Sequence, residues 1–367
     1  MNAYLDSAQK LYDFLHKEFW NGEAFIGPDI GIRFNFRFWR FIKSYLAFIP
    51  WTDNLVYMQA QGYWILANWA LYDLTKDEQY KDIALACSNH VLKAQHSEGF
   101  WDYPNPEWGG RVATVEGDFA AIGLLESYQR TQSPALLDGA QKWYRYLVTE
   151  VGFQEEGDFL AVNYFAGADG VKVPNNSTMT LWFLAKLADT TENSDYLEYC
   201  KGMINWLHHV QLESGELPYA TAGAGGKDRT HFLCYQYNSF QLLDLAAYFR
   251  ITNDQQVVPI IRNLAKYLST GLTDSGACLY NCNQDTPETV YYTMAIGTAL
   301  SEATRLGLGD YSALAKRAFR RALMQQRPDG GFLFFSKGNY RFLSDRRSYP
   351  RHLAMVLHHL LLEVIFQ

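Results

Sequence analysis

The sequence predicts an all-α protein whose paired helices form an inner ring enclosed by an outer ring. Helical hydrophobic periodicity recurs along all 367 residues, and nearly apolar helices alternate with amphipathic ones. The more apolar helices begin near residues 53, 114, 175, 231, 287 and 349, which gives spacings of 61, 61, 56, 56 and 62 residues. A repeat of this length indicates a helical array. Helices without a polar stripe are enclosed on all sides, so we expect them to form the inner ring.

Each helix can be assigned in chain order. An amphipathic helix spans about 2–19, and the first apolar helix, about 53–73, begins at Pro50-Trp-Thr-Asp53. An amphipathic helix follows at about 77–95. The apolar and amphipathic pairing then repeats at 114–130 with 134–149, 175–190 with 194–211, 231–250 with 254–270, and 287–305 with 310–326. A last apolar helix spans 350–364, and Pro350 opens it because a first-turn proline has no helical N–H partner to lose.

Composition excludes several classes of protein. A net charge of −7 and a pI near 5.7 argue against a nucleic-acid partner, which would require a basic face. No apolar run approaches the roughly 18 residues of a transmembrane span. Five scattered cysteines fit neither a disulfide framework nor a zinc site, and we expect no metal and no cofactor. The N-terminal stretch does not have the pattern of a secretory signal, so we expect a cytoplasmic protein.

Turns with a glycine before an aromatic residue mark the same end of successive units. Examples are Gln95-His-Ser-Glu-Gly-Phe-Trp101 and the segment from Gln326 to Phe332. Glycine supplies the left-handed residue that ends a helix. Six helix pairs with such turns resemble the (α/α)6 toroids, a superfamily of six-hairpin glycosidases, polysaccharide lyases, sugar epimerases and terpenoid-cyclase-like proteins. The resemblance covers the whole chain, implies one domain at 1–367, and identifies no single family.

In such a toroid, the N-terminal ends of the inner helices line one mouth of a central cavity. The polar residues expected at this mouth suit a carbohydrate, because carboxylates and amides bind hydroxyl groups while aromatic faces cover sugar C–H surfaces. The catalytic candidates are Glu116, Asp118 and Glu288, with Asp53 in reserve. The substrate-binding candidates are Tyr57, Trp101, Trp108, Asn176, His231, Tyr235, Tyr237, Tyr291, Tyr349, Arg351 and His352.

Several of these residues also have a purely structural interpretation. Asp53 is typical of a helix cap, and Glu116 and Glu288 are typical of a first helical turn. Histidines such as His352 are more often packed than catalytic. Caps do not account for tyrosines inside apolar helices, such as Tyr235 and Tyr291, because a buried hydroxyl needs a partner.

These residues favour a metal-independent glycoside hydrolase. One carboxyl group would protonate the leaving oxygen, and a second would activate water or stabilise the oxocarbenium ion. The alternative is a uronate-directed lyase or C5-epimerase. There Asn176 and Arg351 would neutralise the sugar carboxylate, while Tyr235, His231 or Tyr349 moves the C5 proton. A third class is a terpenoid-cyclase-like protein or a non-catalytic toroid that binds a glycan or lipid; the aspartate-rich motifs of terpenoid cyclases are absent from the sequence.

The segment at 20–50 is an insertion with an unusual pattern. Aromatic and basic residues alternate from Arg33 to Lys43, which predicts a strand or lid with aromatics on one face and bases on the other. Such a lid would cover the cavity mouth, and Arg33, Arg37 and Arg40 would attract an anionic ligand. The pattern fits equally well a hairpin that packs on the barrel, or one that forms the contact of a homodimer.

Overall fold

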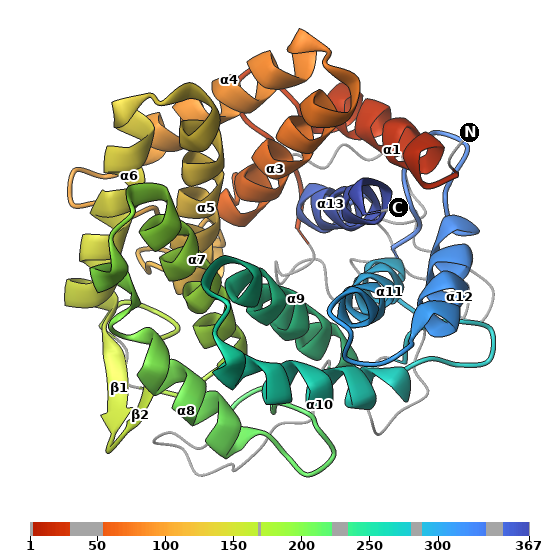
Figure 1. Cartoon of the computed structure of the whole chain (residues 1–367). Coiled ribbons are helices and arrows are strands. Elements are labelled where there is room, and N and C mark those ends of the chain that lie inside the picture. The colour runs from red at the N-terminus through yellow and green to blue at the C-terminus, as the bar shows by residue number, and fades with distance from the viewer. Residues whose placement is uncertain are drawn as a thin grey trace.

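The computed structural model of the chain describes residues 3–29, 54–167, 170–221, 234–279, 288–334 and 348–366. Within these ranges, twelve α-helices alternate between an inner and an outer ring (Figure 1). The inner helices are α3 (Met58–Thr75), α5 (Thr114–Thr131), α7 (Pro174–Thr191), α9 (Cys234–Thr252), α11 (Val290–Arg305) and α13 (Pro350–Ile365). The outer helices are α1 (Ala3–Phe19), α4 (Glu78–Ala94), α6 (Pro134–Tyr146), α8 (Cys200–Val210), α10 (Val258–Ser269) and α12 (Ser312–Leu323). The predicted all-α ring of helix pairs is confirmed.

The inner ring is closed. Each inner helix contacts the next one along the chain, and α13 contacts α3, as Figure 1 shows. The first helix, α1, packs against α13 and serves as its outer partner. Enclosure explains the apolar character of the inner helices: α11 buries fourteen of its sixteen residues, whereas outer helix α12 buries four of twelve.

Some helix boundaries differ from those predicted, for local reasons. Helix α3 begins at Met58 and not near residue 53, because Leu55 is extended and pairs with Gly27. Helix α6 ends at Tyr146 and continues as one π-helical turn, Leu147–Val151. The helix predicted at 194–211 is divided into a 3-10 turn, Ser194–Leu197, and α8.

The glycine turns connect neighbouring outer helices. In three of them a glutamine side chain donates one hydrogen bond to the glycine carbonyl four residues later and another to the next outer helix. The pairs are Gln95 with Gly99 (2.9 Å) and Gly139 (2.9 Å), Gln211 with Gly215 (2.9 Å) and Ile260 (3.1 Å), and Gln326 with Gly330 (2.9 Å) and Ser7 (3.0 Å). These bonds join α4 to α6, α8 to α10 and α12 to α1.

A short hairpin places one loop beside the start of α5. Strands β1 (Phe153–Glu156) and β2 (Phe159–Val162) are antiparallel, with Phe153 opposite Val162. After β2, the hydroxyl of Thr114 donates to the carbonyl of Asn163 at 2.6 Å, and Phe165 pairs with Ala113. These contacts hold Tyr164 next to the first turn of α5.

No described helix is both long and apolar enough to cross a membrane. Of the predicted lid at 20–50, the structure describes only residues up to 29, where Trp20 pairs with Phe25. The basic stretch from Arg33 to Lys43 lies outside the described residues, so its role as a lid or dimer contact stays a prediction.

Candidate active site

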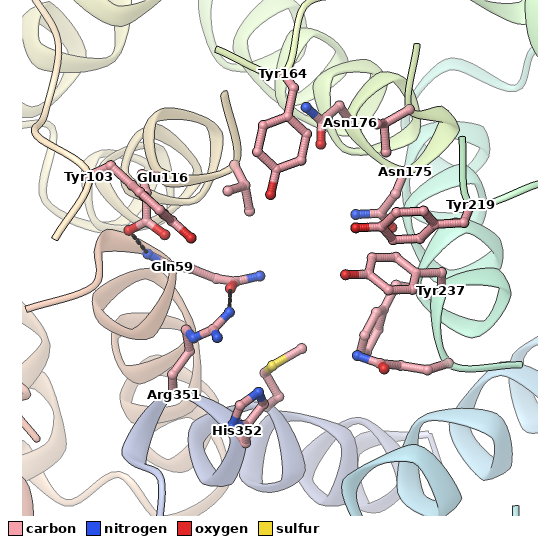
Figure 2. Close-up of a pocket in the computed structure, with 15 residues that line it drawn as sticks. Gln59, Tyr103, Glu116, Tyr164, Asn175, Asn176, Tyr219, Tyr237, Arg351 and His352 are labelled. Atoms are coloured by element: carbon pink, nitrogen blue, oxygen red, sulfur yellow. Dashed lines mark hydrogen bonds between the residues drawn. The ribbon is translucent and has the colours of Figure 1, made fainter. Parts of the chain in front are cut away.

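A cavity lies at the predicted end of the inner ring, where helices α3, α5, α7, α9 and α13 begin (Figure 2). It holds about 610 Å³ of empty space, counting the solvent at its open mouth. Its described lining consists of Gln59, Tyr103, Val115, Glu116, Tyr164, Val173, Asn175, Asn176, Tyr219, Gln236, Tyr237, Phe240, Arg351, His352 and Met355. The many hydroxyl and amide groups of this lining suit a polar ligand.

Glu116 stands on the first turn of α5, with its carboxyl group buried. It accepts a hydrogen bond at 3.1 Å from the backbone N–H of Gln59, and so caps α3, whose N-cap residue Tyr57 makes no capping hydrogen bond with its own side chain. Burial raises the pKa of Glu116 from 4.5 to about 7, although Arg351 and the N–H groups of Met58 and Gln59 favour the charged form. The carboxyl group can therefore carry a proton near neutral pH and release it.

Arg351 lies on the first turn of α13, with its guanidinium fixed on three sides. Its Nε and Nη2 donate to Asp29 at 2.7 and 2.9 Å, and its Nη1 donates to the side chain of Gln59 at 3.0 Å. The guanidinium also lies 4.7 Å from the ring centre of Tyr57. Burial opposes the charge, but Asp29 raises the pKa of Arg351 above its usual value. The fully buried Asp29 thus offsets the positive charge.

The opposite wall is formed by tyrosines and amides. Figure 2 shows Asn175, Tyr219 and Tyr237 facing Glu116 and Gln59 across the cavity. The Tyr219 and Tyr237 rings meet edge to face, with centroids 4.9 Å apart. Burial raises the pKa of Tyr237 well above 10 and also raises that of Tyr219. Both are therefore neutral phenols that donate and accept hydrogen bonds.

His352 follows Arg351 and forms part of the floor of the cavity. Its ring packs against Tyr291 and Phe334, with centroid distances of 4.4 and 5.3 Å. Burial and the charge of Arg351 lower the pKa of His352 to about 3, so the ring is neutral. Its Nδ1 atom is buried and has no hydrogen-bond partner in the described structure.

The ring brings five of the predicted site residues together at the cavity: Glu116, Asn176, Tyr237, Arg351 and His352. Three more lie directly behind them. Tyr57 stacks beneath Arg351, while Tyr291 and Tyr349 pack against His352.

Two predicted catalytic carboxylates face elsewhere. Asp118 lies two positions after Glu116 on α5, so its side chain points in a different direction. It accepts hydrogen bonds from Trp143 at 2.9 Å and Thr180 at 2.7 Å. Glu288 forms a bidentate ion pair with Arg321 of α12, whose Nη2 lies 2.6 Å from the carboxylate. Both carboxyl groups are used in packing between helices.

The remaining candidates do not line the cavity or lie outside the described residues. Trp101 is buried, with its indole N–H bonded to the carbonyl of Val91 at 2.9 Å. Tyr235 stacks on Tyr267 of α10, with centroids 4.9 Å apart. Trp108 is exposed and stacks on Phe165 at 5.4 Å. Asp53 and His231 lie outside the described residues.

Several lining residues were not selected from the sequence. Gln59, Asn175 and Gln236 are on the same first turns as the chosen candidates, where polar residues are expected at the mouth of the cavity. Tyr103, Tyr164 and Tyr219 come from loops, which hydrophobic periodicity does not place. Asp29 gives no local signal, since its partner Arg351 is 322 residues away.

Comparisons with known proteins find structural likeness alone. No family model matches the sequence, and no curated protein gives a significant sequence match. A possible member of the GH105 family from Salmonella enterica has a TM-score of 0.70 at 15% identity, covering 99% of this chain and 94% of that one. Cellobiose 2-epimerase from Bacillus thermoamylovorans has a TM-score of 0.74 at 14% identity, covering 98% and 99%.

A GH76 alpha-mannanase from Bacteroides thetaiotaomicron is a third match, with a TM-score of 0.68 at 13% identity. It covers 98% of this chain and 94% of that one. The ring of helices and these likenesses together show that the chain has the (α/α)6 toroid fold.

Proposed function

We propose that the protein is a carbohydrate-active enzyme, and that it is a glycoside hydrolase with Glu116 as its general acid. The observation that carries the proposal is the position of Glu116 in the cavity lining, together with its raised pKa. It is the carboxyl group of the described cavity lining, and its pKa of about 7 keeps a proton available at neutral pH. A general acid works best with a pKa near the working pH, and a glycosidic oxygen needs a proton to leave.

The other lining groups support the binding of a sugar. Gln59 connects Arg351 to Glu116, since its side chain accepts from Arg351 and its backbone N–H donates to Glu116. Glu116 and Arg351 are thereby held in fixed positions on one side of the cavity. Tyrosine hydroxyls and amides on the far wall would bind sugar hydroxyls. Likeness to a possible member of the GH105 family and to a GH76 alpha-mannanase supports a carbohydrate substrate.

Hydrolysis also needs a second carboxylate in most glycosidases, to activate water or to act as nucleophile. Asp118 and Glu288 are bound to other partners. This leaves Asp53, which precedes α3 in the sequence, as the candidate for that role in the proposal.

A second candidate function is proton transfer at a sugar carbon, as in an epimerase or lyase. The neutral ring of His352, with its unpartnered Nδ1 beside Arg351, favours it. Likeness to a cellobiose 2-epimerase points in the same direction. An epimerase would exchange solvent deuterium into its product, and a lyase would create a double bond that absorbs ultraviolet light.

Glu116→Gln tests the first proposal. Its turnover of an oligosaccharide library, measured as released reducing sugar, should fall by about 10²–10⁴-fold, the usual contribution of general acid catalysis. Asp118→Asn is the matched control, because Asp118 is equally buried but does not line the cavity. Turnover retained in Glu116→Gln, with solvent deuterium exchange abolished in His352→Asn, would replace the first candidate by the second.

A further inference from the structure

One wall of the cavity has amide groups with unused hydrogen-bonding atoms. Asn175 Oδ1, Asn176 Nδ2 and Gln236 Oε1 are buried and have no hydrogen-bond partner in the described structure. Asn176 is 2% exposed and Gln236 is 6% exposed, and both line the cavity. Together with Tyr219 and Tyr237, these three residues form what we call the amide wall.

Two other buried amides of the inner helices have partners for both their donor and their acceptor atoms. Gln61 exchanges hydrogen bonds with the backbone of Phe25 in both directions, at 2.8 and 2.6 Å. Asn238 does the same with Leu217, at 2.7 and 3.0 Å. Gln241, further along α9, also has open amide atoms but does not line the cavity. A buried polar atom without a hydrogen-bond partner is costly. A ligand that supplies partners to the open atoms of the amide wall is therefore bound more tightly than one that does not.

The chemistry of the wall specifies that ligand. Each amide and each phenol offers both a donor and an acceptor, which is also what a hydroxyl group offers. A carboxylate only accepts, and would leave the acceptor atoms of Asn175 and Gln236 unpaired. The rings of Tyr219 and Phe240 add apolar surface for the C–H groups of a sugar.

The charges of the described lining lead to the same choice. Arg351 is its one cationic side chain, and Asp29 already forms two hydrogen bonds to it. His352 is neutral. A uronate carboxylate bound here would lose its water and would find no unpaired cation to replace it. Burial of the carboxylate is therefore unfavourable.

We propose that the amide wall is the binding subsite for the ring of a neutral sugar. The hydroxyl groups of this sugar form hydrogen bonds with the open amide atoms of Asn175, Asn176 and Gln236. This deepens the proposed function, on which it rests, by naming the class of substrate. Glu116 lies across the cavity from Asn175, Tyr219 and Tyr237 (Figure 2), and in the proposal it reaches the glycosidic oxygen at the edge of the subsite.

The test measures binding and not turnover. In the Glu116→Gln background, the methyl glycosides of glucose, mannose and galactose are titrated by calorimetry against the methyl glycosides of glucuronic and galacturonic acid. At least one neutral glycoside should bind, and at least tenfold more tightly than the uronates. Tighter binding of a uronate, or no binding of any probe, would overturn the inference.

Variants of the wall locate the site. Asn176→Leu and Gln236→Leu should each weaken binding of the neutral glycoside by about 2- to 13-fold, the contribution of one hydrogen bond. Gln129→Leu, an exposed amide at the far end of α5, is the matched control and should bind normally. Unfolding midpoints equal to that of the parent show that the wall variants are folded. Binding unaffected by both wall variants would contradict the subsite.

Failure of this inference can be told apart from failure of the proposed function. If neutral glycosides bind at the amide wall while Glu116→Gln retains turnover, the subsite is correct and the acid assignment is wrong. If uronates bind more tightly while Glu116→Gln loses turnover, the acid assignment stands and the class of substrate is wrong.

Discussion

Replacement of Asp29 by asparagine should change both stability and the proton affinity of Glu116. Asp29 has a side chain that is 1% exposed and accepts two hydrogen bonds from Arg351. Asparagine removes the charge and turns an N–H₂ group toward the guanidinium. Removal of one partner of a buried ion pair costs about 3–5 kcal/mol. Arg351 keeps Gln59 and the Tyr57 ring, so we expect the lower value, about 3 kcal/mol.

The expected shift in unfolding temperature follows from the length of the chain. An unfolding entropy of about 2.1 cal/mol/K per residue gives about 0.8 kcal/mol/K for 367 residues. A loss of about 3 kcal/mol therefore lowers the midpoint by about 4 °C. Calorimetry measures this shift directly, and an unchanged midpoint would mean that the pair contributes nothing to stability.

The same substitution leaves the charge of Arg351 uncompensated beside Glu116. The pKa of Glu116 should then fall from about 7 toward its ordinary value of 4.5, since Arg351 favours the carboxylate and Asp29 opposes it. The infrared band of the protonated carboxyl group, identified by its loss in Glu116→Gln, reports this titration. Arg351→Met is the control of opposite sign and should raise the pKa of Glu116. Shifts in the same direction for both variants would refute the reasoning.

Three further predictions concern residues outside the cavity lining. Glu288→Gln breaks the ion pair with Arg321 and should lower the free energy of unfolding, measured in urea, by about 3 kcal/mol. Turnover per folded molecule should be unchanged, and a loss of about 10²-fold would restore Glu288 as a catalytic candidate. Burial raises the pKa of Asp244 from 3.8 to about 8, so the folded state binds a proton more tightly and stability should fall as pH rises between these values. Asp244→Asn should flatten that decline in urea unfolding at stepped pH, and equal slopes would refute it. Gly215→Ala should lower the unfolding midpoint more than Gly157→Ala, because both glycines have positive φ but only a Cβ at Gly215 would lie 2.2 Å from a backbone oxygen of α10; equal losses would contradict this.

The regular part of the fold could be predicted from the sequence because the pattern is local. Inner helices α5, α7 and α13 begin within one residue of the predicted positions. A helix enclosed by other helices needs apolar residues on all its faces, and each inner helix begins a new repeat, so both features are visible in the local sequence. The start of α3 was predicted too early. The sequence Pro50-Trp-Thr-Asp53 is typical of a helix start, whereas pairing of Leu55 with Gly27 keeps the described chain extended until Met58. Such pairing between distant residues leaves no periodic signal.

The position of the cavity could be predicted, but its lining could not. Helix N-termini indicated the end of the ring where the cavity lies, yet Glu116 and Asp118 are both acidic and only two residues apart. Trp143 and Thr180 bind Asp118 from neighbouring helices, which no local pattern reveals. The loop tyrosines, such as Tyr164, depend in the same way on how the hairpin β1–β2 packs beside α5.

Closure of the ring by α1 and α13 has a consequence for the order of folding. Asp29 and Gln59 meet Arg351 across separations of 322 and 292 residues, so the cavity is built over the junction between the first and last helices. Closing a flexible loop of about 320 residues costs about 5 kcal/mol of chain entropy, before its contacts can repay it. We therefore expect docking of α13 against α1 and α3 to be a late step of folding. During synthesis on the ribosome, Arg351 and His352 are added after the other eleven described α-helices, so the described lining of the cavity is complete only once α13 has docked.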